Sequence, residues 1–130
     1  MDQVHIAVLN SSKEITDVVS QIFRAEGFST STSFTYLYKN NEEAFDNFLK
    51  KNKPSVIIYD VALPYEQNYE LFRSLSKRDL AKDIPIILTT TNKKALESLV
   101  GKTKTYELIG KPYDLKEIVN AVRRVLKAQE

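Results

Sequence analysis

The 130-residue chain has no cysteine, a single histidine and only three glycines, and each shortage narrows what it can do. Without cysteine it can form no disulfide, thiolate zinc site or cysteine nucleophile. The lone histidine, His5, has no second histidine with which to hold a metal or relay a proton, and we expect it at the surface, away from any functional site. No glycine occurs between Met1 and Glu26, which argues against a glycine-rich loop for a flavin or nucleotide phosphate.

Long apolar runs and strong charge asymmetry are also missing. No stretch is apolar enough to cross a membrane, so we expect a soluble, cytoplasmic protein without membrane contact. The 19 basic and 17 acidic residues leave a net charge of +2 and form no dense basic run, so the charge pattern does not favour nucleic-acid binding. A chain of this length fits one domain, which we expect to span residues 1–130.

Short apolar runs alternate with helical patterns along the whole chain. The runs predict strands over residues 4–9, 28 to about 37, 55–60, 84–90 and 106–109. Ser11 and Glu14 have the spacing of a capping box before the first helical pattern, and Asp114 opens the last one in the same way. Strict alternation of this kind predicts a three-layer α/β domain, in which helices cover both faces of a five-stranded parallel sheet.

In an open parallel sheet, functional side chains gather beyond the carboxyl ends of the strands. The predicted strands place Asn10, Asp60, Thr90 and Lys111 there. A carboxylate could attack a phosphoryl group, while a lysine and a hydroxyl could neutralise and hydrogen-bond its oxygens. Each residue alone has a simpler explanation as a helix cap or a solvated side chain, so only the combination favours phosphoryl chemistry.

Three segments carry a resemblance to the response-regulator receiver domains of two-component signalling. They are the Asp-Val-Ala-Leu-Pro run at 60–64, the Ile-Pro-Ile-Ile-Leu-Thr-Thr run at 84–90 and the Gly-Lys-Pro-Tyr run at 110–113. The resemblance covers the chain from end to end. It implies a doubly wound, flavodoxin-like (βα)5 fold with strand order 2-1-3-4-5.

The resemblance also implies roles for single residues. Asp60 would be the phosphoacceptor, Thr90 and Lys111 would contact the phosphoryl group, and a cis peptide would precede Pro112. The partner would be a histidine kinase or a phosphotransfer protein. Such a domain is not an enzyme beyond its own phosphorylation and dephosphorylation.

The chain departs from the family at the residues that assist Mg²⁺ binding. Where the family carries an acid pair after the first strand, Asn10 and Ser11 stand instead. The remaining candidate ligands are the Asp60 carboxylate, the Asn10 amide oxygen and the Ala62 backbone carbonyl, so we expect weak Mg²⁺ affinity. Leu108 stands at the family's aromatic switch position, which favours simple packing there over a moving aromatic ring.

Tyrosines cluster on the loops expected at the carboxyl ends of the strands. Tyr36 and Tyr38 lie in a segment longer than the family needs, and Tyr65 and Tyr113 lie on two other loops of the same side. They could form a lid or partner surface near Asp60, or they could pack on neighbouring helices; the sequence does not choose between these.

Two functions therefore remain open. The domain could accept a phosphoryl group on Asp60 and change its surface in response. Alternatively, it could be a degenerate receiver that binds a downstream effector, or a second copy of itself, without phosphorylation, through its fourth helix, fifth strand and fifth helix. Asp60, Thr90 and Lys111 favour the first function, whereas the lost acid pair and the leucine at 108 favour the second.

Overall fold

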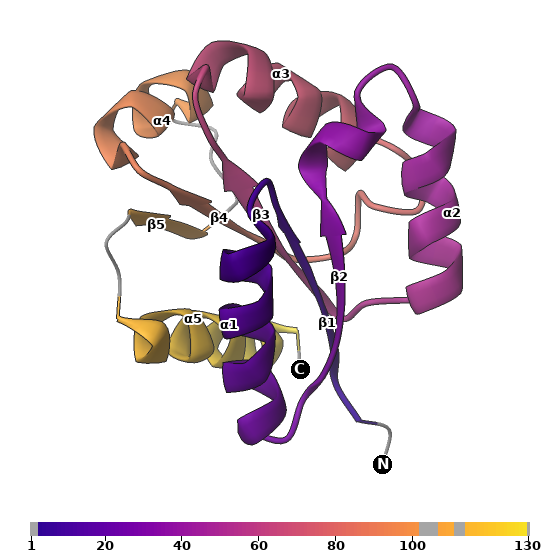
Figure 1. The fold of residues 1–130 in the computed structure, drawn as a ribbon, viewed down its shortest axis with the longest axis vertical. Coiled ribbons are helices and arrows are strands. Elements are labelled where there is room, and N and C mark those ends of the chain that lie inside the picture. Colours follow the sequence, from indigo (N-terminus) through magenta and orange to yellow (C-terminus); the bar gives the residue numbers. More distant parts are fainter. Residues whose placement is uncertain (1–2, 102–106, 111–113, 130) are drawn as a thin grey trace.

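The computed structural model describes residues 3–101, 107–110 and 114–129, and its central feature is a five-stranded parallel sheet (Figure 1). The strands are β1 (His5–Asn10), β2 (Ser29–Phe34), β3 (Val56–Val61), β4 (Ile86–Thr90) and β5 (Glu107–Gly110). Their order in the sheet is β2-β1-β3-β4-β5, and every neighbouring pair is parallel. The predicted fold class and strand order are thus confirmed.

Helices cover both faces of this sheet. They are α1 (Lys13–Ala25), α2 (Glu42–Asn52), α3 (Tyr65–Ser76), α4 (Lys93–Val100) and α5 (Leu115–Ala128), with a short 3-10 helix, η1 (Thr35–Tyr38). Figure 1 shows α1 and α5 together on one side and α2, α3 and α4 on the other. None of the helices in the described part of the chain is long and apolar enough to span a membrane.

The sheet separates two hydrophobic cores, because successive side chains of a strand point to opposite faces. Ile58 and Ile87 belong to the core under α1 and α5, which is built mainly from aliphatic side chains. Tyr59 and Leu88 belong to the core under α2, α3 and α4, which also contains the rings of Phe45, Phe72, Tyr38 and Tyr69. β1, β3 and β4 are buried along nearly their whole length, as their apolar sequences predict for central parallel strands.

Two local predictions were wrong. The second strand ends at Phe34, and the next four residues form η1, in which the ring of Tyr38 is buried against Phe45. The N-cap of α1 is Ser12, whose side chain accepts the amide of Ile15 at 3.3 Å, whereas Ser11 is exposed. Both differences follow from contacts that the periodicity of the sequence does not encode.

His5 also lies in a different setting from the one expected. It is half-buried, and its ring nitrogens each lie 2.6 Å from a hydroxyl, Nδ1 from Ser29 and Nε2 from Ser31. Ser31 in turn donates to the side-chain oxygen of Asn52 at 2.7 Å, so this network joins β1, β2 and the end of α2. Burial lowers the pKa of His5. The histidine is a structural link at the edge of the sheet, remote from the carboxyl ends of the strands.

Candidate functional site

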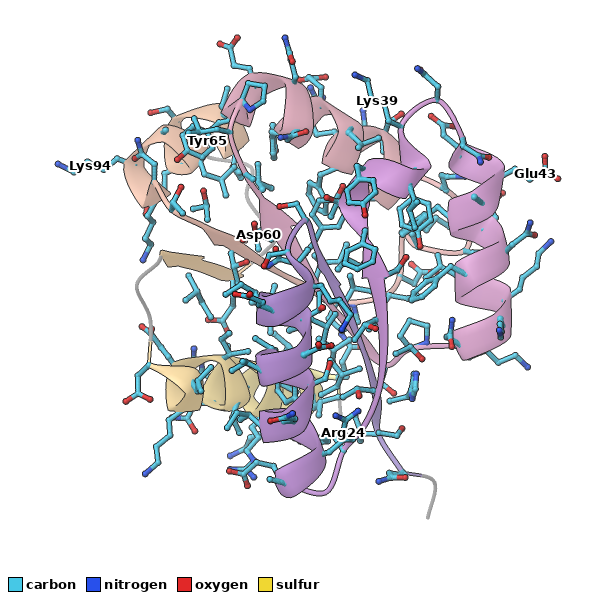
Figure 2. All side chains as sticks on the ribbon, viewed as in Figure 1. Arg24, Lys39, Glu43, Asp60, Tyr65 and Lys94 are labelled. Carbon is cyan, nitrogen blue, oxygen red and sulfur yellow. The ribbon has the colours of Figure 1, made fainter. Side chains whose placement is uncertain are left out.

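Asp60 lies near the carboxyl end of β3 and is 5% exposed (Figure 2). Residues Ile6, Val8, Val56 and Ile58 lie in the core under α1 and α5, so strand alternation puts Asn10 and Asp60 on that same face. Leu9 pairs with Tyr59, which makes Asn10 and Asp60 the next register positions on adjacent strands. Asn10 and Asp60 therefore lie on the same face of adjacent strands, at the carboxyl edge of the sheet.

The hydroxyl that reaches Asp60 comes from Thr89. Its Oγ1 donates to Oδ1 of Asp60 at 2.6 Å, and the two residues are register partners on β3 and β4. Thr89 was not among the residues predicted from the sequence. The signal that could have found it is strand parity, because Thr89 lies two residues after the buried Ile87 on the face that also carries Asp60.

Thr90, the predicted phosphoryl contact, is fully buried one position further along β4. Its hydroxyl accepts the amide of Asn92 at 3.3 Å, in the turn that leads into α4. Its role toward a phosphoryl group stays a prediction. Lys111 and Pro112 lie outside the described residues, as does the side chain of Leu108. The structure has a cis peptide between Leu63 and Pro64, in the loop after Asp60.

The oxygens of Asn10 and Ala62, which were expected to assist a metal, accept hydrogen bonds from within the chain. The side-chain oxygen of Asn10 accepts the amide of Ser12 at 3.0 Å and so closes the turn into α1. The carbonyl of Ala62 accepts the side-chain amide of Asn68 at 2.8 Å. Ser11 is exposed on the turn.

This donor set does not fit a tight magnesium site. Mg²⁺ prefers an octahedron of hard oxygen ligands that includes a carboxylate or two. Of the three candidate ligands named from the sequence, Asp60 alone supplies a carboxylate, and the oxygens of Asn10 and Ala62 already accept hydrogen bonds. Among the described residues no group of three or more histidines, cysteines, aspartates or glutamates is arranged to hold a metal.

The tyrosines expected on the rim have separate environments. Tyr38 is 3% exposed, packs against Phe45 and bonds Ser33 through its hydroxyl at 2.6 Å, so it belongs to the core. Tyr36 is exposed and stacks on Phe34 with ring centroids 5.4 Å apart.

Tyr65 differs from both of them, because it bonds the hydroxyl of Thr91 and so links α3 to the loop after β4. In Figure 2 it lies toward the corner where α3 and α4 meet. Tyr113 lies outside the described residues.

A comparison with protein families identifies the chain. Residues 6–123 match the family model described as the response regulator receiver domain. The chain belongs to this family. Receiver domains are signalling modules rather than enzymes in general, they interact with histidine kinases and phosphotransfer proteins, and they typically bind Mg²⁺ at an acidic pocket.

Individual relatives are distant. The chain is 23% identical over 123 residues to the phosphate regulon transcriptional regulatory protein PhoB of Escherichia coli (strain K12). The aligned residues make up 94% of this chain and 51% of PhoB. It spans about half the length of the curated relatives it matches. The chemotaxis response regulator CheY4 of Vibrio cholerae has a similar fold, with a TM-score of 0.73 at 20% identity over 95% of this chain and 99% of that one.

A receiver domain of a signal transduction histidine kinase from Syntrophus aciditrophicus also has the same fold. It superposes with a TM-score of 0.73 at 24% identity, over 96% of this chain and 91% of its own. This chain has the same arrangement, a parallel sheet between two helical layers.

Proposed function

We propose that this receiver accepts a phosphoryl group on Asp60 from a partner histidine kinase or phosphotransfer protein. The observation that carries the proposal is the setting of Asp60, a buried carboxylate at the carboxyl edge of the sheet with a hydroxyl of β4 directly bonded to it. The buried Thr90 follows on the same strand and is the expected contact for the transferred group.

The transfer is a single displacement at phosphorus. An oxygen of Asp60 forms a bond to phosphorus while the bond from phosphorus to the donor's imidazole nitrogen breaks, and that nitrogen leaves with the electron pair. The product is an acyl phosphate, whose extra negative charge must be met by donors at the sheet edge. Thr90 and Lys111 are the residues we propose for this task.

The test is intact-mass measurement after incubation with a small-molecule phosphodonor, with and without magnesium. Asp60→Asn is the matched control, because it keeps the shape of the side chain and removes the nucleophilic carboxylate. We expect a phosphoryl adduct in the wild type alone. If small donors and a set of purified histidine kinases and phosphotransfer proteins all fail to produce an adduct, the proposal is wrong.

A second candidate function has its own supporting observation. The oxygens of Asn10 and Ala62 are already hydrogen-bonded within the chain, an arrangement that suits a domain working without metal or phosphoryl group. Such a domain would bind an effector or a second copy through α4, β5 and α5. On that face Arg124 of α5 donates hydrogen bonds to both carboxylate oxygens of Glu107 on β5, at 3.1 and 2.9 Å. Partner binding that is equally tight in the wild type and in Asp60→Asn would favour this function.

A further inference from the structure

Thr89, which the family pattern does not single out, donates a buried hydrogen bond directly to the side chain of Asp60. The Thr89 hydroxyl is 2.6 Å from Oδ1 of Asp60, and the two residues are 1% and 5% exposed. In this hydrogen bond the Thr89 hydroxyl donates and the carboxyl oxygen of Asp60 accepts. A hydrogen bond to a charged acceptor is about twice as strong as one between neutral groups.

The surroundings explain why this contact is specific. Thr89 follows Ile87 on the face of β4 that packs under α1 and α5, where neighbouring side chains are aliphatic. A valine has nearly the same shape but is not an equivalent replacement, because it lacks the hydroxyl that donates to Asp60. A hydroxyl buried there needs a partner, and the carboxylate of Asp60 provides it.

We propose that Thr89 is a positioning residue with two effects. Its hydroxyl holds Oδ1 of Asp60, so that Oδ2 is the oxygen that bonds phosphorus. The same hydrogen bond shortens the lifetime of the acyl phosphate. This inference rests on the proposed function of Asp60 as phosphoacceptor. It assigns to Thr89 a role distinct from that of Thr90, whose hydroxyl bonds the turn before α4.

The reason lies in how charge moves during hydrolysis. In the acyl phosphate Oδ1 is a carbonyl oxygen with little negative charge, so the bond from Thr89 is weak. When water attacks phosphorus, the bond between phosphorus and Oδ2 breaks and its electron pair returns to the carboxylate, while the water oxygen and its protons leave with inorganic phosphate and the medium. Negative charge then reappears on Oδ1, and the bond from Thr89 strengthens as the transition state forms.

The test compares Thr89→Val, which removes the hydroxyl and keeps the shape, with Thr89→Ser, which keeps the hydroxyl. Thr16→Val is the matched control, because Thr16 is also a buried threonine but its hydroxyl bonds the Lys13 carbonyl in α1. After loading with a small phosphodonor and removing it, decay of the adduct is followed by intact mass. We expect Thr89→Val to slow the decay about tenfold, and Thr89→Ser and Thr16→Val to decay like the wild type.

A second measurement does not depend on phosphorylation. Urea unfolding of Thr89→Val, Asp60→Ala and the double variant forms a cycle that reports whether the two side chains interact. We expect the double variant to be more stable than the sum of the single effects predicts. Additive effects would contradict the contact.

The outcomes separate the inference from the function on which it rests. An adduct that forms in every variant and decays at one common rate overturns the role of Thr89 and leaves Asp60 as acceptor. Failure of every donor and every kinase to form an adduct in any variant overturns the proposed function, and the inference with it.

Discussion

Arg78 and Asp46 form a two-pronged ion pair that joins the turn after α3 to α2. The Nε and Nη2 atoms of Arg78 each donate to a different carboxylate oxygen of Asp46, both at 2.7 Å. Nη1 of the same guanidinium bonds Glu42, which also accepts the hydroxyl of Ser74 at 2.8 Å. Both partners of the pair are half-buried, so the contact fixes the spacing of two helices on one face of the sheet.

This ion pair should make stability depend on pH in the acid range. The hydrogen bonds that Asp46 accepts from Arg78 hold the pKa of Asp46 below the ordinary value of 3.8, and burial opposes them with a smaller effect. A depressed pKa stabilises the folded state fully above the ordinary value, and this contribution is lost as pH falls through the folded-state pKa. Asp46→Asn should therefore be less stable than the wild type near neutral pH, and the gap should close as the pH falls below the ordinary value of 3.8 and through the lower folded-state pKa.

Urea unfolding at a series of pH values measures this gap. Asp17→Asn is the control, because its pair with Lys13 spans a single exposed helical turn and should contribute little at any pH. A gap for Asp46→Asn that does not change with pH would show that the side chain acts through packing and not through its charge.

The two serines at the start of α1 should differ in their effect on stability. Ser12→Ala removes the oxygen that accepts the amide of Ile15, and we expect a loss of about 1 kcal/mol in the free energy of unfolding. Ser11→Ala should change it by less than about 0.5 kcal/mol, because Ser11 is an exposed residue of the preceding turn. Equal losses in the two variants would contradict the assignment of Ser12 as the cap.

Tyr59 and Tyr38 offer a similar comparison in the core. The hydroxyl of Tyr59 is buried and has no hydrogen-bond partner within the described part of the chain, and burial raises the pKa of this phenol. Tyr59→Phe should therefore stabilise the fold by about 1 kcal/mol. Tyr38→Phe should destabilise it by about 1 kcal/mol, because the hydroxyl of Tyr38 bonds Ser33. Thermal unfolding of both variants decides, and a destabilised Tyr59→Phe would mean that this hydroxyl has a partner.

Returning an acid to the first strand should create a need for a cation. Asn10→Asp would place a second buried carboxylate on the strand next to that of Asp60. Neighbouring strands are about 4.8 Å apart, and two negative charges at that range repel each other. We expect this variant to lose about 2 kcal/mol of stability without metal and to regain it in millimolar-range magnesium. Asn120→Asp is the control, because it makes the same change at an exposed position of α5. Thermal unfolding with and without magnesium checks this, and a variant that magnesium does not stabilise would contradict it.

The sequence predicted the architecture because its signals are local and repeated. Apolar strands such as residues 55–60 are followed by amphipathic helices, and caps such as Asn41 and Asp114 stand where the helices begin. The end of β2 was predicted three residues too late, because the alternating hydroxyl and aromatic residues up to Leu37 fit a strand and a tight helix equally well. Burial of the Tyr38 ring against α2 decides between them, and that is a tertiary contact.

The site was predicted only in part for a similar reason. Asp60 and Asn10 were placed together because both end a strand. Thr89 was missed because it stands beside a second threonine, and only the register between β3 and β4 shows which hydroxyl faces the carboxylate. The bonds of Asn10 to Ser12 and of His5 to two serines are likewise contacts of a folded chain, and no spacing in the sequence indicates them.

The hydrogen bond between the Asn10 side chain and the backbone of Ser12 has a consequence for the charge around Asp60. Neighbouring carboxylates disfavour each other's charged form, and a nearby positive charge has the opposite effect. Here an amide takes the place of an acid and is already satisfied by the backbone of Ser12. The position of the Asn10 side chain is therefore fixed by a hydrogen bond within the chain, and Asn10 adds no negative charge beside Asp60.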